Sequence, residues 1–447
     1  MRKLFNRLHH QYGLLADRLG ISRRRLAGYG LVALVVFALT LHVRNASSSD
    51  PGSWFFNPTT GYSRKYSAIR QLQAERFIEA AESTPPYTKT HQAKGLCVGV
   101  PSIARDGARY LRNTVGSLLS GLSQQERDGV YFMVLIPHSD PSIHPAMHEP
   151  WLSNVVDEIL VYNVSEKEMG YIESLEREDV EHRTKGLYDY KYLMEACYAK
   201  DTPYIALIED DVIAMDGWYH RTVNAIQRIE SLSGAKGFLY LRLFYTEEFL
   251  GWNNEHWPTY AFWSILFIAG SAALVHWLPV RFQWPRRVLT PRFSAVIAAL
   301  VVPWMVMLVF AAGKVTVFPL PEGVNRMNNF GCCAQGFVFP RERAGKIIEW
   351  FESSRLGFAD MLIEEYANKH NEQRWAITPS VLQHVGTKSS KPDDFGHGAK
   401  FAKSVAGTIW NFGFERLSSQ RLHEEHEEHE LSANGVHGLV RGVEQGG

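Results

Sequence analysis

Residues 204–211 read Tyr-Ile-Ala-Leu-Ile-Glu-Asp-Asp, an apolar run that ends in three carboxylates. Five consecutive apolar or aromatic residues are typical of a buried strand. The acids Glu209, Asp210 and Asp211 cannot belong to a core, because burying an unpaired charge costs several kcal/mol. At the carboxyl edge of a sheet, where α/β proteins bind their ligands, such oxygen ligands suit Mn²⁺ or Mg²⁺. The stretch therefore indicates a metal–diphosphate site, and the alternative is a solvated acidic turn.

Strand-like and helical patterns alternate on both sides of this stretch. Such alternation predicts an α/β fold with a largely parallel sheet. The pattern stops between about residues 245 and 335 and resumes after that gap. The expected strands are residues 96–103, 130–136, 155–161, 204–208, 238–244 and 336–339, and the expected helices are 187–199, 341–351 and 358–369.

The composition argues against a nucleic-acid-binding protein and leaves the pairing of the cysteines open. The 447 residues carry a formal net charge of +0, so the chain lacks the basic footprint of a nucleic-acid-binding protein. Its four cysteines do not show the Cys-x-x-Cys spacing of a zinc site. In an oxidising compartment, Cys332 and Cys333 could bond to each other, or one of them to Cys97 or Cys197. The alternative is free buried thiols.

The N-terminal region predicts a membrane anchor. Residues 1–25 are basic, and residues 26–43 are apolar, with His42 their only ionisable side chain. A helix of this length, at about 1.5 Å per residue, can span a bilayer. The positive-inside rule places residues 1–25 in the cytosol and the following chain beyond the membrane. A signal peptide is the alternative, but the run is long for one and no clear Ala-x-Ala site follows it. Residues 44–93 are expected to form a luminal stem with one helix at 66–82.

Residues 258–314 predict a transmembrane hairpin. Two apolar runs, about residues 260–278 and 293–312, flank a short loop that carries arginines and no acid. This basic loop belongs on the cytosolic side, which agrees with the topology of the first anchor. The hairpin is therefore expected to interrupt one catalytic domain, formed by residues 94–257 and 315–388. Buried core helices are the alternative. The arginines are Arg281, Arg286, Arg287 and Arg292.

Both basic segments give one topology. The N-terminus and the hairpin loop are cytosolic, and the parts of the catalytic domain are luminal. Two acceptor sequons, at Asn45 and Asn163, then lie on the luminal side.

The C-terminal segment, residues 389–447, is polar and is expected to be partly disordered. It contains His423–His429, which reads His-Glu-Glu-His-Glu-Glu-His. A repeat of this kind is typical of low-complexity sequence, and metal chelation is the alternative function. We expect no function from this tract.

The end of the first strand offers a candidate nucleotide site. Pro101 and Arg105 follow an apolar run, so a base and ribose would lie over the proline turn with Arg105 near a phosphate. Lys185, just before the helix at 187–199, is a second phosphate candidate. The alternatives are a surface arginine at a helix start and a solvated lysine.

Three further side chains complete the expected chemistry. His384 is a candidate metal ligand beside Glu209–Asp211, because neutral imidazole binds Mn²⁺-type ions, and a structural histidine is the alternative. Asp360, near the amino end of a helix, is expected to be the general base that takes a proton from an acceptor hydroxyl. Glu364 and Glu365 are the other candidates for the base, and in the alternative Asp360 is only a helix-start acid. One base and one metal suffice to transfer a sugar from a nucleotide diphosphate with inversion. The paired carboxylates of glycosidases are arranged differently.

These features resemble the GT-A glycosyltransferases. The motif Val-Pro-Ser-Ile-Ala-Arg at residues 100–105 and the triplet Glu209–Asp211 carry that likeness. The inserted hairpin, the pair Cys332-Cys333, the stretch 357–361 and the stretch 384–386 resemble more specifically the Golgi post-GPI-attachment N-acetylgalactosaminyltransferase family. The likeness covers about residues 96–386 and leaves out the stem and the tail.

The resemblance implies a Golgi membrane enzyme that moves GalNAc from UDP-GalNAc to the first mannose of GPI-anchor glycans, with inversion and a Mn²⁺-dependent triplet. It implies that Asp211 is a direct metal ligand, that Asp210 lies near the ribose or the waters of the metal, and that Glu209 lies near the donor sugar. Three spans would hold the catalytic domain beside an acceptor that is anchored in the bilayer. The alternatives are a UDP-sugar transferase for another luminal glycan or glycolipid, and a non-catalytic membrane scaffold with a degenerate transferase fold.

Overall fold

The computed structural model describes residues 22–89, 95–105, 107–179, 183–283, 289–327, 331, 333–387, 401 and 403–433. The chain divides into two compact units, which we call the helical unit and the sheet unit. The helical unit comprises residues 1–61 and 250–319, and the sheet unit comprises residues 62–249 and 320–447. The helical unit therefore interrupts the sheet unit in the sequence.

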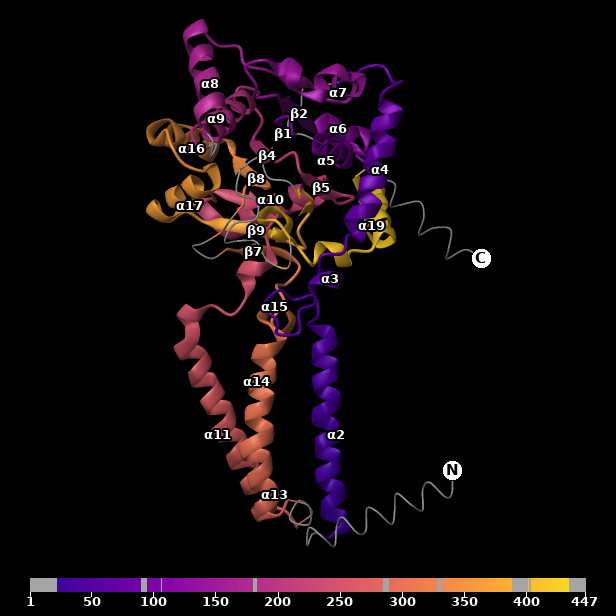
Figure 1. Cartoon of the computed structure of the whole chain (residues 1–447), viewed down its shortest axis with the longest axis vertical. Coiled ribbons are helices and arrows are strands. Elements are labelled where there is room, and N and C mark those ends of the chain that lie inside the picture. The colour runs from indigo at the N-terminus through magenta and orange to yellow at the C-terminus, as the bar shows by residue number, and fades with distance from the viewer. Residues whose placement is uncertain are drawn as a thin grey trace, which may run out of the picture. The chain divides into compact units, whose positions relative to one another are not determined.

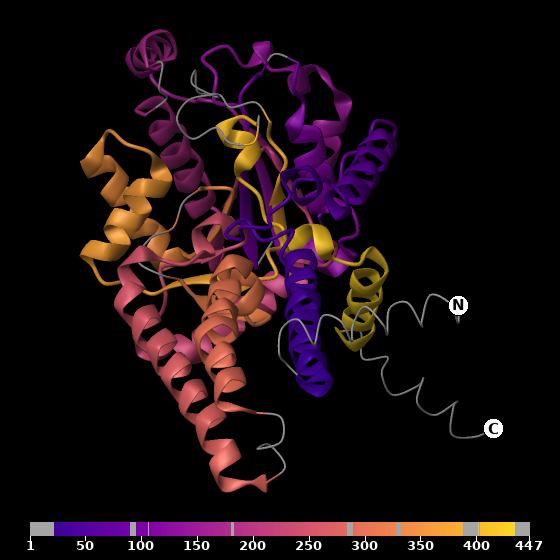
Figure 2. The same cartoon turned by 60° about the horizontal axis from the view of Figure 1, so that its bottom comes forward.

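Within the described residues, the helical unit has three helices that are long and apolar enough to cross a membrane (Figure 1). They coincide with the three apolar runs of the sequence, and their side chains are largely exposed, as lipid-facing side chains are. Figure 2 shows α11 beside α13 and α14 as a hairpin. Within this unit, the edge of the Tyr29 ring packs against Phe293, with ring centroids 4.7 Å apart. The helices are α2 (Arg23–Ala46), α3 (Pro58–Gly61), α11 (Trp257–Arg281), α13 (Pro291–Val296), which continues through a π-helical turn at Ile297–Val301 into α14 (Val302–Ala312), and α15 (Lys314–Val317).

The sheet unit is built on an eight-stranded sheet with the order β3-β2-β1-β4-β8-β6-β9-β7. Strands β3, β2, β1 and β4 are parallel, β8 runs antiparallel to both β4 and β6, and β9 is parallel to β6. A mixed α/β fold with a parallel half is therefore confirmed. The strands are β1 (Leu96–Pro101), β2 (Val130–Leu135), β3 (Glu158–Leu160), β4 (Tyr204–Ile208), β6 (Tyr240–Arg242), β7 (Gly323–Arg326), β8 (Gly336–Pro340) and β9 (Arg374–Thr378), and a separate two-stranded sheet pairs β5 (Val212–Ala214) with β10 (Leu382–His384).

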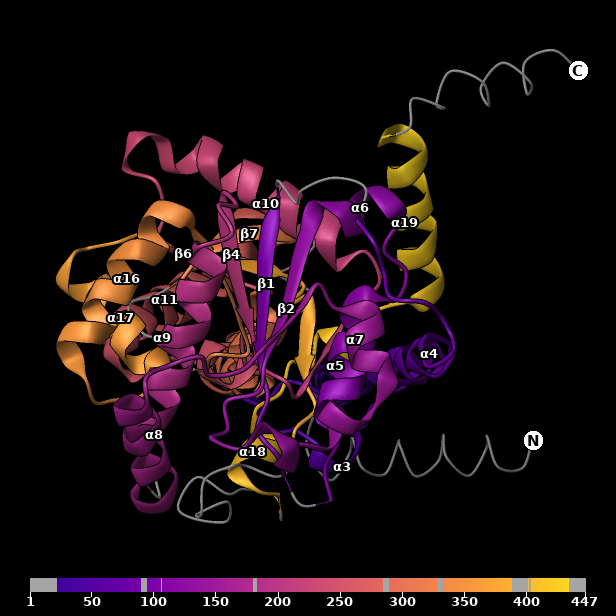
Figure 3. The same cartoon turned by 90° about the horizontal axis from the view of Figure 1, so that it is seen from above.

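Helices cover both faces of the large sheet, as Figure 3 shows from above. One face packs against α9, α16 and α17, and the other packs against α4, α5 and α10. The helices of this unit are α4 (Tyr66–Ala81), α5 (Tyr110–Leu119), α6 (Gln124–Gly129), α7 (Pro150–Val155), α8 (Glu166–Glu178), α9 (Lys185–Tyr198), α10 (Trp218–Ser233), α16 (Arg341–Ser354), α17 (Ala359–Lys369), α18 (Val405–Thr408) and α19 (Ser419–Ala433).

The core follows the alternation of side chains along the strands. Cys97 and its strand neighbour Val98 are both buried, but they point to opposite faces of the sheet. Gly99 lets α9 approach the sheet closely, because a Cβ there would lie 2.9 Å from Cγ of Leu193. A disulfide between Cys97 and Cys197 joins β1 to α9 on this face.

This disulfide excludes two of the cysteine states that the sequence left open. Cys97 and Cys197 are not free thiols, and neither is joined to the Cys332-Cys333 pair, because they are bonded to each other. Cys333 is disulfide-bonded as well, and Cys332 lies outside the described residues. The sheet brings Cys97 and Cys197, 100 residues apart in the sequence, to a Cα–Cα distance of 5.6 Å. That distance is within the range of disulfides, but no sequence spacing shows it.

Part of the C-terminal segment, including the His-Glu tract at 423–429, is folded. Residues 405–408 and 419–433 are helical, and the chain between them packs into the sheet unit. Phe414 is completely buried, and its ring centroid lies 5.2 Å from that of Tyr66 in α4. The polar composition hides these few apolar anchors, which order the segment. Residues 388–400, 402 and 434–447 lie outside the described residues.

Candidate active site

The acidic triplet lies where β4 ends, between the large sheet and the short strand β5. β5 begins directly after Asp211 and pairs antiparallel with β10, so that Val212 lies opposite His384. The backbone N–H of Val385 donates to the carbonyl of Asp211 at 2.8 Å. The two-stranded sheet thereby brings His384 to the triplet across 173 residues of sequence.

Asp211 and His384 form the centre of the site. Nε2 of His384 lies 3.3 Å from Oδ2 of Asp211, and Nδ1 lies 3.1 Å from the carbonyl of Ile409. A carbonyl oxygen can only accept a hydrogen bond, so Nδ1 of His384 is protonated and donates to Ile409. The other ring nitrogen, Nε2, faces the carboxylate of Asp211. Gly386 leaves the space for this pair, because a Cβ there would lie 2.5 Å from Oδ2 of Asp211 and 2.9 Å from Nε2 of His384.

Asp210 is tied to the end of β1. Nη1 of Arg105 donates to both oxygens of Asp210, at 2.8 and 2.7 Å, and Oγ of Ser102 donates to Oδ2 at 2.5 Å. Oγ1 of Thr114 donates to the carbonyl of Asp210 at 2.6 Å and holds the backbone. Both carboxylate oxygens of Asp210 are therefore engaged by Arg105, so this residue is placed to orient the site rather than to bind a metal directly.

Glu209 lies in a crowded negative environment. Nε2 of Gln335 donates to its Oε2 at 2.9 Å. Burial, together with the charge of Asp211, raises the pKa of Glu209 to about 8, against the opposing effect of His384. The carboxylate of Asp360 contributes to the same rise, so it lies within electrostatic range of the triplet.

The charges of the site fit a divalent cation. Among the described residues, Arg105 is bonded to Asp210 and acts on Asp211 and Glu209 from a greater distance, whereas His384 lies directly against Asp211. Burial alone would raise the pKa of Asp211, but His384 holds it below its usual value, so Asp211 stays ionised. Oδ1 of Asp211 is buried, and no donor among the described residues reaches it. Carboxylate oxygens with one imidazole nitrogen are ligands that suit Mn²⁺ or Mg²⁺.

Of the three candidate bases, only Asp360 lies in a suitable environment. It is half-buried near the start of α17, and its Oδ2 accepts the backbone N–H of Cys333 at 3.0 Å. Glu364 is buried between Arg242 and Arg374, each 2.8 Å away, and it also accepts the hydroxyl of Tyr240. Both carboxylate oxygens are occupied by these donors, so Glu364 is not placed to meet an acceptor hydroxyl. Glu365 is exposed on another face of the helix.

Lys185 is also a structural residue. It is buried, and its ammonium donates to the Pro137 carbonyl at 2.8 Å, to the Tyr162 hydroxyl at 2.8 Å and to both oxygens of Asp189. These bonds engage the donors of an ammonium group, so Lys185 is not available to a phosphate. The i, i+4 spacing from Lys185 to Asp189 was the sequence signal for this ion pair.

Pro101 ends β1 and leads into a small pocket. Ser102, Arg105, Tyr110 and His144 line this pocket together with Asp210. Arg105, the predicted nucleotide contact, lines this pocket, and its guanidinium is bound to Asp210.

The chain matches a family of known description over its central part. Residues 96–383 match the family described as GPI-N-acetylgalactosamine transferase PGAP4. The chain belongs to this family. The matched segment begins at β1 and ends at Gln383, beside His384, so it includes the acidic triplet and Asp360.

The curated relatives that this chain matches are N-acetylglucosaminyltransferases. The alpha-1,3-mannosyl-glycoprotein 4-beta-N-acetylglucosaminyltransferase B of Mus musculus is 30% identical over 160 residues, which are 31% of this chain and 28% of that protein. The corresponding transferase A of Bos taurus is 25% identical over 240 residues, 48% of this chain and 45% of that protein. Transferase C of Macaca fascicularis is 22% identical over 234 residues, 46% of this chain and 47% of that protein. The chain thus spans less than half the length of these relatives.

Several residues of the PGAP4-family site were missed by the sequence analysis. Ser102 and His144 act on Asp210 in series, because Nε2 of His144 lies 3.1 Å from Oγ of Ser102. Gln335 binds Glu209, and Gly386 makes room beside Asp211. Ser102 and Gly386 lie within stretches that the sequence does single out, residues 100–105 and 384–386, whereas His144 and Gln335 carry no local signal.

Proposed function

We propose that the chain is a membrane-bound, metal-dependent glycosyltransferase that moves GalNAc from UDP-GalNAc to the first mannose of GPI-anchor glycans, with inversion. Membership of the family supports the donor and the acceptor. The observation that carries the metal dependence is the buried excess of carboxylate at Glu209 and Asp211, with an oxygen of Asp211 that no described donor reaches.

In this proposal, Asp211, Glu209 and His384 hold Mn²⁺ or Mg²⁺. When bound, the ion supplies positive charge that stabilises the leaving diphosphate. Burial raises the pKa of Asp210, and Arg105 and Ser102 oppose this rise and hold its carboxylate in one orientation, near the ribose in this proposal. This arrangement fixes the carboxylates before the substrate arrives, so little reorganisation is needed during transfer.

Asp360 is the proposed general base. Its carboxylate takes the proton of the acceptor hydroxyl as that oxygen forms a bond to the anomeric carbon of the donor sugar. The bond from the anomeric carbon to the phosphate oxygen breaks on the opposite face, and the UDP leaves with the bonding electrons. A single displacement of this kind inverts the anomeric configuration.

The membrane supplies the acceptor in this proposal. The three apolar helices would anchor the enzyme in the Golgi membrane, with the N-terminus in the cytosol and the sheet unit in the lumen. A GPI glycan is held at the luminal leaflet by its own lipid, so anchoring both partners raises the effective concentration of the acceptor.

A second candidate function is transfer of GlcNAc to a mannosyl glycoprotein. It is favoured by the relatives, whose names describe N-acetylglucosaminyl transfer to such acceptors. Both candidates use an N-acetylhexosamine donor and a mannose-containing acceptor, and they share the metal and the base.

Release of UDP tests the reaction. Purified full-length protein with Mn²⁺ is offered UDP-GalNAc, UDP-GlcNAc or UDP-Gal, with a GPI glycolipid or a mannosyl glycoprotein as acceptor. We expect turnover with UDP-GalNAc and the GPI acceptor, and its loss in Asp211→Ala and in Asp360→Asn. Glu365→Gln, a matched change on the same helix, should keep the activity.

Each result of this assay has a defined meaning. Turnover of UDP-GlcNAc on the glycoprotein, without GalNAc transfer, would replace the first candidate by the second. Full activity in Asp360→Asn would exclude Asp360 as the base. Absence of both turnover and Mn²⁺–UDP binding would exclude the enzyme and leave the membrane scaffold. The anomeric configuration of the product, measured by proton NMR, tests inversion.

A further inference from the structure

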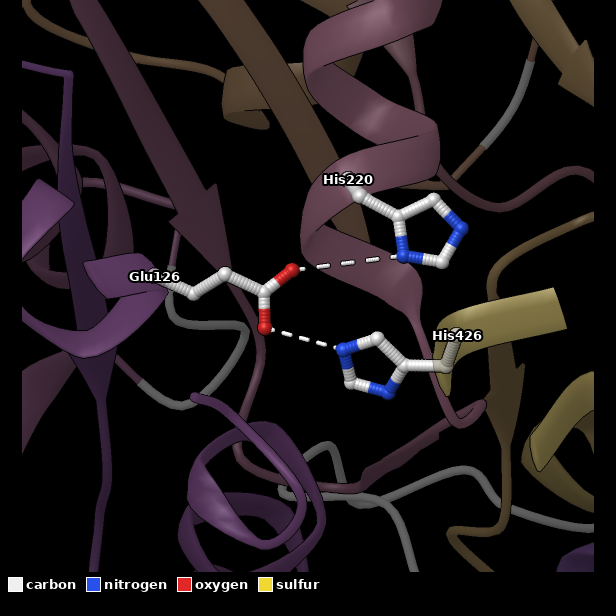
Figure 4. A group of neighbouring side chains, drawn as sticks. All are labelled: Glu126, His220 and His426. Carbon is white, nitrogen blue, oxygen red and sulfur yellow. Dashed lines mark hydrogen bonds and ion pairs between the residues drawn. The ribbon is translucent and has the colours of Figure 1, made fainter. Parts of the chain in front are cut away.

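A second cluster of ionisable side chains lies beyond the other end of β5. Glu126 in α6, His220 in α10 and His426 in α19 each offer one ligand atom, and these atoms all lie within 4.8 Å of one another. Figure 4 shows both imidazole rings facing the two oxygens of the Glu126 carboxylate. All three side chains are at most 7% exposed.

The second nitrogen of each imidazole is close to a carboxylate. Nδ1 of His426 lies 3.0 Å from Oδ1 of Asp216, while Nε2 lies 2.9 Å from Oε2 of Glu126. Nε2 of His220 lies 3.4 Å from Oε1 of Glu425, while Nδ1 faces Glu126. A histidine that binds a metal typically donates its other N–H to a carboxylate in this way.

The cluster leaves two buried polar atoms without a hydrogen bond. Oε1 of Glu126 and Nδ1 of His220 find no partner among the described residues. They face each other at 4.0 Å, which is too long for a hydrogen bond. An imidazolium at His426 between Glu126 and Asp216 would explain the short contacts of His426, but it would leave these two atoms unsatisfied.

The backbone at Gly217 permits the position of His220. Gly217 precedes α10 with a φ of 71°, in the left-handed region that favours glycine. A Cβ at this residue would lie 2.3 Å from Cε1 and 2.9 Å from Nδ1 of His220. The ring therefore folds back over a glycine, and its Nδ1 faces Glu126.

We propose that Glu126, His220 and His426 form a second cation site, for Zn²⁺ or a similar transition metal, which fastens the C-terminal helix α19 to the sheet unit. Two imidazoles and one carboxylate suit Zn²⁺, whereas the carboxylate-rich triplet suits a harder ion. Tetrahedral Zn²⁺ with bonds of about 2.0–2.2 Å separates its ligand atoms by roughly 3.3–3.6 Å, so atoms that now lie within 4.8 Å of one another would close by at most about 1.5 Å. Three protein ligands leave the fourth position to water.

The site gives the His-Glu repeat of residues 423–429 a role. His426 is the buried histidine of the repeat, and it contacts residues that lie 210 and 300 positions earlier in the chain. The ligands come from α6, α10 and α19, so one ion would join three helices. The proposal does not depend on the proposed transferase activity.

Metal counting tests the site directly. Full-length protein in detergent is stripped with EDTA, incubated with Zn²⁺ and passed through a desalting column, and the retained zinc is measured by mass spectrometry. We expect His426→Gln and Glu126→Gln to lose one equivalent that the parent and Asp211→Asn retain. The amide oxygen introduced by Glu126→Gln can still accept the N–H of Ser123, as Glu126 does at 3.1 Å, so this variant keeps the start of α6 intact. If His426→Gln fails to fold, the zinc content of Glu126→Gln decides whether the site exists.

Further measurements distinguish this site from chelation at the surface. His423, in the same repeat, is 65% exposed and is not one of the three ligands, so His423→Gln should retain the zinc. Asp216→Asn should weaken Zn²⁺ binding about 10- to 100-fold, the usual effect of losing a carboxylate that orients a ligand. Co²⁺ in place of zinc should give the intense visible bands of a four-coordinate ion, and Zn²⁺ should slow hydrogen exchange in residues 419–433.

The proposal is overturned if the parent retains no zinc at this site. It is also overturned if both Glu126→Gln and His426→Gln retain as much zinc as the parent, which would leave a buried ion pair. Loss of zinc in His423→Gln but not in Glu126→Gln would identify chelation by the exposed repeat instead.

Discussion

At the scale of single residues, Gly386 is the position where one atom would disturb the proposed metal site. Gly386→Ala places a Cβ 2.5 Å from Oδ2 of Asp211 and 2.9 Å from Nε2 of His384. The pair must move apart, and a displacement near 1 Å in a catalytic group costs on the order of 10²-fold in rate. We expect a loss of that size in Mn²⁺-dependent turnover of UDP-GalNAc, measured by UDP release.

The matched control for this substitution is Gly170→Ala. A Cβ at Gly170, in α8, meets no atom within 4 Å, and alanine favours a helix by up to about 1 kcal/mol over glycine. Gly170→Ala should keep full activity and unfold at an equal or higher temperature. Normal turnover in Gly386→Ala would show that Asp211 and His384 do not act as a closely fitted pair.

His144 should make the sheet unit less stable at acidic pH. Its Nδ1 accepts the N–H of Ala146 at 3.2 Å, and burial, with the charges of His138 and Arg105, lowers its pKa from 6.5 to about 4. The unfolded chain binds the proton near pH 6.5 and the folded chain resists it, so stability is lost as the pH falls below 6.5. At pH 5 the loss is at most about 2 kcal/mol.

The comparison of His144→Asn with the parent isolates this effect. The difference in the thermal unfolding midpoint between pH 7 and pH 5, followed by tryptophan fluorescence, should be smaller in the variant. His148→Asn, at an exposed histidine four residues later, should behave as the parent does. An unchanged pH dependence in His144→Asn would mean that other groups cause the acid sensitivity.

The position of the acidic triplet could be predicted from the sequence because it follows a buried strand. Carboxylates directly after a buried strand must lie at its end, which located Glu209–Asp211 without any structure. Glu364 stayed among the candidate bases because its partner Arg242 is 122 residues away, so no neighbouring residue in the sequence shows their ion pair. His144 and Gln335 were missed for the same reason, since each acts through a contact that the fold alone creates.

At the scale of elements, length and apolar content decided which ones could be predicted. The strand at 204–208 has the predicted bounds, and the helix of α16 begins at the predicted residue, Arg341. β5 has three residues and β7 has four, too few for a periodic pattern. β5 nonetheless pairs with β10 and so brings His384 to Asp211. This short strand, which the site depends on, therefore has no periodic pattern in the sequence that could predict it.

The tail stabilises the start of α4 through Glu415. Its Oε2 accepts the backbone N–H groups of Lys65 and Ser67, at 2.7 and 3.2 Å, at the helix end where such groups lack partners. Its Oε1 accepts Nε2 of Gln383, the neighbour of His384, at 3.0 Å. Glu415→Ala should destabilise the sheet unit by about 1–2 kcal/mol, the usual effect of losing a helix cap.

Calorimetry of the full-length protein can measure this loss. Glu424→Ala is the control, because Glu424 is exposed in α19 and its carboxylate accepts Nε2 of Gln420, one turn earlier in the same helix, at 2.9 Å. It should change the unfolding temperature little. If Glu415→Ala unfolds at the parent temperature, the tail does not contribute to the stability of α4.

At the scale of the whole molecule, two independent features agree with the proposed luminal position of the sheet unit. Three helices have the length and composition of membrane spans, and a disulfide joins Cys97 to Cys197. Disulfides form and persist in oxidising compartments and are rare in the cytosol. In the proposed topology, the sheet unit, which contains the disulfide, lies on the luminal side and the basic residues 1–25 lie in the cytosol.

Glycosylation at Asn163 tests this orientation. Asn163 is exposed in the loop between β3 and α8, within the sequon Asn163-Val164-Ser165, and only a luminal sheet unit can meet the glycosylation machinery. We expect protein expressed in mammalian cells to lose mass on treatment with a glycosidase, and Asn163→Gln to lack that glycan. Ser165→Thr is the matched control, because threonine keeps the sequon and can still accept the N–H of Glu168, as Ser165 does at 3.3 Å. If the glycan is absent and protease added outside sealed vesicles digests the sheet unit, the sheet unit is cytosolic and the proposed topology is wrong. A cytosolic sheet unit could not meet a luminal GPI glycan, so that result would exclude the proposed acceptor as well.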